Sequence, residues 1–277
     1  MTGRDLDTNL QTYERQDVAS YYAALDYLTP CERLLFETYI PRGSAILDLG
    51  VGGGRTTPYL SARASRYVAV DYAASMVQAC QAKFPGLEFL VADAADLSRF
   101  ANSSFDVVVF SFNGIDTLSD DGRHRCLQHI CRILKPGGFL IFSTHNPRLF
   151  IVRPSWNRER LRTLAQRYSA GSKVLSRFLY VVLRSFAVGV ACGRASVASL
   201  QRILRRFPTR TFWRGEGRLF DSAHGGMSTH YAAPKRVLEE MSAFNLRVVR
   251  ILGDDYPLAS HVCLTGWYYY VFAKPEK

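Results

Sequence analysis

The sequence predicts an α/β protein built on a doubly wound, mostly parallel sheet with helices on both faces and a helical insertion. Three observations predict this fold. Short apolar strands alternate with helical stretches over residues 44–146, a glycine run follows the first strand, and the fourth strand is apolar almost throughout, as a strand covered on both faces should be. The chain has 277 residues, 48% of them hydrophobic, which is enough to bury a sizeable core.

The predicted elements follow one another in strand–helix order. The strands span residues 44–48, 67–71, 87–91, 105–111 and 139–143. The helices span 56–64, 74–84 and 120–134, and Pro136 with the two glycines after it stops the last helix. This spacing is typical of parallel strands joined by crossover helices.

The pattern breaks at Pro147 and resumes near Tyr231 with a helix over 234–244 and strands over 246–252 and 267–273. We therefore predict three parts. They are a tyrosine-rich helical lid (1–43), a core (44–146 and 231–277) and a basic helical insertion (147–230).

The net charge of +11 belongs to one segment. Residues 148–218 carry 16 Lys and Arg against two acids, a net of +14, whereas the remainder has 19 basic and 22 acidic residues, a net of −3. Apolar residues recur at helical spacing in the middle of the insertion: Leu175, Phe178, Leu179, Val182, Leu183 and Phe186.

Four interpretations of this basic helix stay open. It can be a solvated cap, a pocket for an anionic group, a peripheral membrane surface or an RNA-binding surface. RNA is the least favoured, because the cations alternate with aliphatic residues and not with aromatic residues exposed on a sheet.

The N-terminal residues show no apolar leader, and the apolar run 178–192 is too short and too polar to span a bilayer. The six cysteines are scattered without a C-x-x-C pair, which favours reduced thiols over a disulfide framework or a metal site. We expect a cytoplasmic protein, with peripheral membrane contact as the alternative.

A glycine loop closes the first predicted strand in the pattern D-x-G-x-G-x-G, with Asp48, Gly50, Gly52 and Gly54. Glycines let the backbone turn sharply and approach a ligand, although a tight turn without a ligand has the same appearance. The dinucleotide pattern G-x-G-x-x-G fails, because its third glycine would fall at Arg55.

The next two predicted strands also end in acids. Asp71 can accept both hydroxyls of a ribose or cap the following helix, and Asp93 can accept a proton of an adenine amino group. Met76 lies where it can cover an adenine face or pack in the core. Acids at three successive strand ends face one crevice.

These segments resemble class I S-adenosylmethionine-dependent methyltransferases of the small-molecule type, which have a Rossmann-like, seven-stranded sheet. The resemblance rests on residues 47–54, 70–76, 91–94, 105–110 and 134–140.

The resemblance implies S-adenosylmethionine as cofactor, S-adenosylhomocysteine as product, and a role for each matching residue. Gly50, Gly52 and Gly54 would pass the methionine part, Asp71 would bind the ribose, and Asp93 with Ala94 would hold the adenine. Asp48 would support the loop. Tyr72, Met76 and Ser111 complete the expected cofactor contacts.

The fourth strand runs into Asn113 and Asp116, where methyltransferases of base amino groups often carry [D/N]-P-P-[Y/F]. The absence of that motif weighs against nucleic acid as acceptor. Asn113, Asp116, Asn146 and Tyr22 are the expected acceptor contacts, and Asp116 can equally cap the next helix.

A hydroxyl acceptor usually needs a general base. His145, at the end of the fifth strand, is the first candidate, and His224 and His230 are the others. We expect O-methylation of a sugar or secondary metabolite, with the insertion and N-terminal helices capping an acceptor that carries an anionic group in one interpretation. N-methylation, RNA methylation and a non-catalytic cofactor-binding partner protein remain alternatives.

Overall fold

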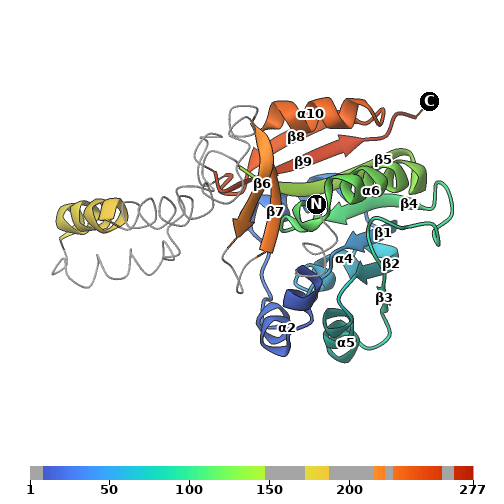
Figure 1. The fold of residues 1–277 in the computed structure, drawn as a ribbon, viewed down its shortest axis with the longest axis horizontal. Coiled ribbons are helices and arrows are strands. Elements are labelled where there is room, and N and C mark those ends of the chain that lie inside the picture. The colour runs from blue at the N-terminus through green and yellow to red at the C-terminus, as the bar shows by residue number, and fades with distance from the viewer. Residues whose placement is uncertain (1–8, 147–171, 187–214, 222–226, 258–264, 277) are drawn as a thin grey trace, which may run out of the picture. The chain divides into compact units, whose positions relative to one another are not determined.

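The computed structural model describes residues 9–146, 172–186, 215–221, 227–257 and 265–276 (Figure 1). Among these residues, seven strands form one sheet in the order β3-β2-β1-β4-β5-β9-β8. The strands are β1 (Ser44–Leu49), β2 (Ala64–Asp71), β3 (Glu88–Val91), β4 (Phe105–Phe110), β5 (Leu134–His145), β8 (Arg247–Gly253) and β9 (Trp267–Ala273). The predicted fold class is confirmed.

Strands β1 to β5 pair in parallel, and β9 runs antiparallel between β5 and β8. The strand order reverses between β1 and β4, and ligands of open α/β sheets bind outside the carboxyl ends of the strands at such a point. The functional site is therefore expected at the carboxyl edge, where β1, β4 and β5 end.

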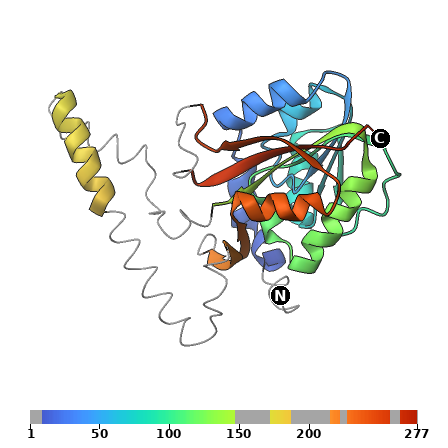
Figure 2. The same ribbon diagram turned by 90° about the horizontal axis from the view of Figure 1, so that it is seen from above.

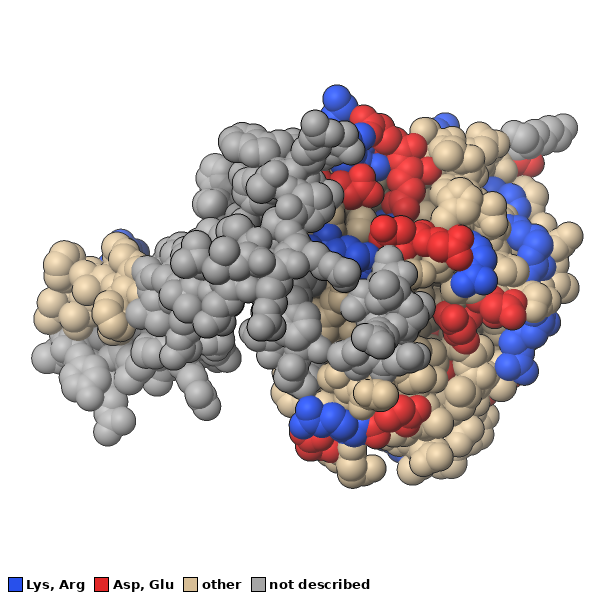
Figure 3. Space-filling model, viewed as in Figure 1, with Lys and Arg blue, Asp and Glu red and all other residues tan. Residues whose placement is uncertain are grey.

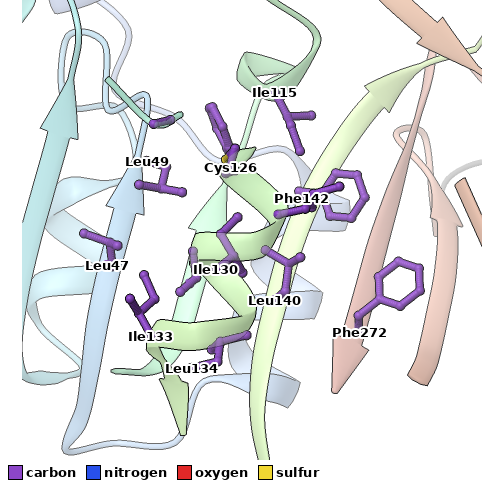
Figure 4. Close-up of a cluster of buried hydrophobic side chains, with 14 of the residues drawn as sticks. Leu47, Leu49, Ile115, Cys126, Ile130, Ile133, Leu134, Leu140, Phe142 and Phe272 are labelled. Atoms are coloured by element: carbon purple, nitrogen blue, oxygen red, sulfur yellow. The ribbon is translucent and has the colours of Figure 1, made fainter. Parts of the chain in front are cut away.

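The helices divide between the two faces because successive strand side chains point in opposite directions. Helices α3 (Pro30–Tyr39), α4 (Thr57–Ser61) and α5 (Ala74–Lys83) cover one face, where Ile46 is buried. Helices α6 (Asp120–Ile133) and α10 (Pro234–Ser242) cover the other, where Leu47 is buried. In the view from above, the sheet separates the blue helix at the top from the green α6 and the orange α10 (Figure 2), and Figure 4 shows Ile130 of α6 beside Leu140 of β5.

The described N-terminal residues include two helices that precede β1. Helix α2 (Gln16–Ala23) buries Val18 and Ala19 against Met76 of α5. Helix α3 begins with a capping box in which Thr29 and Glu32 satisfy each other's backbone N–H groups.

A hairpin that the sequence pattern did not predict packs beside the sheet. Its strands β6 (Glu216–Asp221) and β7 (Met227–Ala232) pair antiparallel. Buried Asn9 donates from Nδ2 to the carbonyls of Thr117 and Ser228, which joins the N-terminal segment to β7 and to the short helix η1 (Gly114–Thr117).

The chain divides into two compact units, Met1–Asn146 with Arg214–Lys277, and Pro147–Trp213. The unit that holds the sheet thus resumes at Arg214 and contains the hairpin, whereas the sequence placed the end of the insertion at residue 230. The second unit contains the predicted amphipathic helix, described over residues 173–186. Within the described residues, none of the helices is long and apolar enough to cross a membrane.

Three predicted boundaries were wrong by three residues or more. The helix expected over 56–64 ends at Ser61, because β2 begins at Ala64, which pairs with Ser44, and not at residue 67. Strand β5 begins at Leu134 and not at residue 139, because Leu134 pairs with Phe105 across a local register shift.

Candidate functional site

The glycine loop leaves β1 in a conformation that favours glycine. Gly50, Gly52 and Gly54 all have positive φ, at 60°, 54° and 79°. A Cβ on Gly50 would lie 2.7 Å from Cε2 of Phe110, and one on Gly54 would lie 2.5 Å from Cε2 of Phe84. The fold itself therefore requires glycine here, which supports the structural interpretation of the loop.

The C-terminal end of α2 rests on the same loop. A Cβ on Gly53 would lie 2.2 Å from the backbone nitrogen of Ala23 and 2.3 Å from the carbonyl carbon of Tyr22. Sequence reasoning did not single out Gly53, because its neighbours already filled the motif. The contact brings Tyr22, an expected acceptor contact, next to the glycine loop.

Asp71 joins the end of β2 to the glycine loop. Its Oδ2 accepts a hydrogen bond from the Gly52 N–H at 2.9 Å, and its Oδ1 accepts one from the Ala73 N–H at 3.0 Å. Burial raises the pKa of Asp71 to about 6, although these backbone hydrogen bonds act in the opposite direction. At neutral pH the group is thus an ionised acceptor beside the loop.

Asp48 of β1 holds the residues that follow the glycine loop. Its Oδ2 accepts hydrogen bonds from the Thr56 hydroxyl at 2.7 Å and the Tyr67 hydroxyl at 2.9 Å. Burial raises its pKa to about 6. These contacts hold the start of α4 against β1 and β2.

Four more expected cofactor residues follow the ends of β2 and β3 or lie in α5. Asp93 is exposed, and its Oδ1 accepts from the Ala95 N–H at 2.8 Å, while Ala94 is buried. The buried hydroxyl of Tyr72 has no hydrogen-bond partner in the described part of the chain. Met76 is 1% exposed and packs with α2, which supports its packing interpretation.

A buried ion pair links α3 to the loop. The guanidinium of Arg55 donates to both carboxylate oxygens of Glu32, at 2.7 and 2.5 Å, and lies 4.5 Å from the ring centre of Phe112. Burial raises the pKa of Glu32, but the hydrogen bonds and charge of Arg55 outweigh it and lower the pKa overall. Ser111, an expected cofactor contact, donates its hydroxyl to Glu32 and belongs to this network.

Asp116 of η1 is fully buried and faces the end of β5. One oxygen, Oδ2, accepts from the His145 backbone N–H at 2.8 Å and lies 2.8 Å from His145 Nδ1. The other, Oδ1, accepts from the Thr144 hydroxyl at 2.7 Å and lies 3.3 Å from Arg123. Burial raises the pKa of Asp116, yet the hydrogen bonds from His145 and His230 outweigh it, so the pKa is well below its usual range.

An ionised Asp116 makes His145 Nδ1 the protonated nitrogen, which leaves a lone pair on Nε2. That nitrogen accepts a long hydrogen bond from Nδ2 of Asn113 at 3.4 Å, and the side chain of His145 is 16% exposed. Asn113 has positive φ at 63°, and its buried Oδ1 has no hydrogen-bond partner among the described residues. A carboxylate, a histidine and an amide thus converge at the carboxyl edge, in an arrangement that can accept a proton at Nε2.

Comparisons with known proteins relate part of the chain to methyltransferases. A family model described as a methyltransferase domain matches residues 46–138. A demethylmenaquinone methyltransferase from Clavibacter sepedonicus is 35% identical over 121 residues, 42% of this chain and 47% of that protein. A fatty-acid O-methyltransferase from Mycolicibacterium smegmatis is 30% identical over 126 residues, 42% of each. The matches span about half the length of these curated relatives.

The solved crystal structure of a S-adenosylmethionine-dependent methyltransferase from Methanosarcina mazei has the same fold. Its TM-score is 0.56 at 18% identity, over 91% of this chain and 100% of that one. Residues 46–138 are therefore a methyltransferase domain, on the fold of S-adenosylmethionine-dependent methyltransferases.

The residues of this methyltransferase domain fit its cofactor. A Cβ on Gly52 would have only Cδ1 of Tyr22 within 4 Å, at 3.9 Å, so the loop leaves open space beside its backbone there. Asp71 presents an ionised carboxylate, and the buried hydroxyl of Tyr72 has no hydrogen-bond partner in the described part of the chain. The resemblance implies that the loop holds the methionine part, Asp71 the ribose and Asp93 the adenine.

The other two histidines differ from His145. His230 of β7 is 5% exposed, and its Nε2 lies 3.3 Å from Oε1 of Glu216. Burial lowers the pKa of His230, but Asp116 and Glu216 outweigh it and raise the pKa overall, which favours the cation over a general base. His224 lies outside the described residues.

Asn146 has a structural role in the methyltransferase domain. It is 1% exposed, its Nδ2 donates to the Thr265 carbonyl at 2.9 Å, and its N–H donates to the Gly266 carbonyl at 3.1 Å. These bonds tie the end of β5 to the segment before β9.

Sequence reasoning missed two residues of the site, Glu32 and Arg55. Arg55 follows the glycine run directly, and Glu32 completes the T-x-x-E capping pattern that starts at Thr29. The pattern accounts for Glu32 as a helix cap, but its ion pair with Arg55 depends on how α3 packs on the sheet.

Proposed function

We propose that the protein transfers the methyl group of S-adenosylmethionine to a hydroxyl oxygen of a small-molecule acceptor, with His145 as general base. The observation that carries this proposal is the Asp116–His145 pair, whose Nδ1–Oδ2 distance is 2.8 Å. A neutral amine carries its own lone pair, so an oriented base is of most use to a hydroxyl acceptor.

When bound, the cofactor would supply a methyl group on a positively charged sulfur, and that sulfur would keep the electron pair of the broken carbon–sulfur bond as the methyl passes to the acceptor oxygen. Nε2 of His145 would accept the proton of the acceptor hydroxyl. Asp116 orients the imidazole and stabilises the imidazolium that forms. The glycine loop aligns donor and acceptor, which supplies much of the rate in a displacement of this kind.

The proposed acceptor is a sugar or secondary metabolite. The name of the Mycolicibacterium smegmatis relative, a fatty-acid O-methyltransferase, supports transfer to oxygen in a related protein. The second unit and the N-terminal helices are proposed to cap the acceptor. The absence of the [D/N]-P-P-[Y/F] motif supports a small molecule over a nucleic-acid base.

The acceptor chemistry can be tested with cofactor labelled with carbon-13 in the methyl group and a metabolite extract of the source cells. We expect a labelled product whose methyl carbon has the chemical shift of a methoxy group. Label in an N-methyl or C-methyl product would contradict the proposed acceptor.

The base can be tested with His145→Gln. We expect turnover to fall about 100- to 10,000-fold, because the hydroxyl loses its proton acceptor. The Kd of S-adenosylhomocysteine, measured by calorimetry, should stay within about twofold, since the base acts on the acceptor. His124→Gln, on exposed α6 surface, is the matched control. Unchanged turnover in His145→Gln would refute the assignment.

A further inference from the structure

The helix over residues 173–186 exposes an unusual amount of apolar surface. Phe178 is 63% exposed, Phe186 65% and Val174 80%. More than half of the exposed large hydrophobic side chains in the described part of the chain lie on this one helix: Val174, Leu175, Phe178, Val181, Val182 and Phe186. Contiguous apolar surface of this kind marks an interaction site.

The apolar and charged side chains of the helix are separated. At about 100° per residue, the six exposed apolar side chains fall within an arc of about 140°. Lys173, Arg177 and Arg184 fall within an adjacent arc of about 40°. The helix carries no acidic residue. In Figure 3 it shows mainly uncharged side chains, with cations at one edge.

These features match a helix that lies in a membrane interface. No described helix is long and apolar enough to cross a bilayer. An interfacial helix buries its apolar face at the boundary between headgroups and acyl chains, and its cations attract anionic lipids.

We propose that the exposed face of helix 173–186 docks on the surface of an anionic phospholipid bilayer. Val174, Phe178 and Phe186 would enter the interface, and the three cations would contact lipid phosphates. Charge complementarity favours an anionic bilayer as the partner of this face. Residues 148–218 carry a net +14 and the rest of the chain a net −3, so attraction acts at this segment and orients the protein. The proposal does not depend on the acceptor chemistry.

Other occupants fit the observations less well. A second copy of the chain would bring two strongly basic segments together. RNA would satisfy the cations but leave the two exposed phenylalanines and four aliphatic side chains in water.

The test is co-sedimentation of the full chain with vesicles of phosphatidylcholine alone and of phosphatidylcholine mixed with phosphatidylglycerol. We expect binding to the anionic vesicles, weaker binding to the neutral ones, and partial release by salt, because the apolar contact remains. Equal recovery with both vesicles, or none with either, would overturn the proposal.

Two double variants separate the contributions. Phe178→Ser with Phe186→Ser should weaken binding to anionic vesicles at least about tenfold. Arg177→Gln with Arg184→Gln should weaken it about 30-fold, at about fivefold per cation. The charge-matched control, Arg42→Gln with Arg247→Gln, removes two exposed cations from the other unit and should stay within about twofold.

Two further readouts keep the outcome unambiguous. All variants should bind S-adenosylhomocysteine within about twofold of the parent without vesicles, which shows that the core is intact. Equal weakening in the control pair would overturn the proposal in favour of net charge alone. A concentration-dependent dimer in sedimentation, abolished by the phenylalanine pair and without vesicle binding, would assign the face to a second copy.

Discussion

Asp71 and Asp116 are both buried carboxylates, yet their surroundings move their pKa values in opposite directions. Burial dominates at Asp71 and raises its pKa to about 6, because its partners are backbone N–H groups. At Asp116 burial also raises the pKa, but His145, His230 and Arg123 outweigh it. The first can change charge near neutral pH, whereas the second stays ionised and orients the base.

Asp71→Asn should weaken S-adenosylhomocysteine binding about 10- to 100-fold at pH 7, because a charged hydrogen-bond acceptor to the ribose is lost. In the parent, affinity should fall as the pH drops below about 6, where Asp71 takes up a proton. Calorimetry from pH 7.5 to pH 5 measures both effects. Asp96→Asn, at an exposed carboxylate, is the control, and a parent profile as flat as that of Asp71→Asn would contradict the role.

The acids at the strand ends could be predicted from the sequence because their positions follow from strand lengths alone. Glu32 and Arg55 could not, since they lie 23 residues apart and meet only when α3 packs on the sheet. The orientation of the His145 side chain could not be predicted from the sequence either, because it depends on the position that η1 gives to Asp116. Residue type and position are local information, whereas partners are set by tertiary structure.

At the scale of elements, α2 and the glycine loop depend on each other. At Gly53 the loop lies so close to the C-terminal end of α2 that a Cβ would overlap its backbone, and the φ of Gly53 is not positive. Helix α2 also buries Val18 and Ala19 on α5. The N-terminal region is thus docked at two places around the cofactor edge.

Gly53→Ala should displace α2 and destabilise the fold by about 1–3 kcal/mol, because the added methyl overlaps the backbone of Tyr22 and Ala23. Amide hydrogen exchange in α2 should accelerate more than exchange in β4. Gly86→Ala is the control: its φ of 90° strains an alanine, but nothing lies within 4 Å of the new Cβ. Similar α2 exchange in both variants would show that backbone strain, not overlap, is responsible.

The hairpin β6–β7 shows which elements sequence patterns miss. Its two strands are six residues each, and the six residues of β7 include three polar ones, Ser228, Thr229 and His230. Short strands with mixed composition give no clear period-2 signal, and Thr229 and His230 are buried by contacts with the sheet and η1. By contrast, the apolar strands β1 and β4 were predicted within one residue.

For the whole molecule, the buried carboxylates predict an unusual pH dependence. The pKa values of Asp48 and Asp71 are raised to about 6, above the value near 4 of an unfolded aspartate. The folded state therefore binds protons that the unfolded state does not, and stability rises as the pH falls through 6. The raised pKa of His230 acts in the same direction.

Lowering the pH from 7 to 5 should increase the free energy of unfolding by about 2 to 3 kcal/mol from the two aspartates. Urea denaturation at the two pH values measures the difference. Asp48→Asn with Asp71→Asn should remove most of it, whereas Asp96→Asn with Asp121→Asn, at exposed sites, should not. A parent that loses stability over this range would contradict the assignment.

The position of β9 in the sheet has a consequence for how the protein is made. Strands β1 to β5 are synthesised first and can pair as they leave the ribosome, but β5 then has an open edge. Only β9 closes that edge, and it pairs His145 with Trp267. The intervening segment and β8 must emerge before β9 can insert between β5 and β8. The nascent chain can thus form its cofactor loop well before the strand that carries the proposed base is held on both sides.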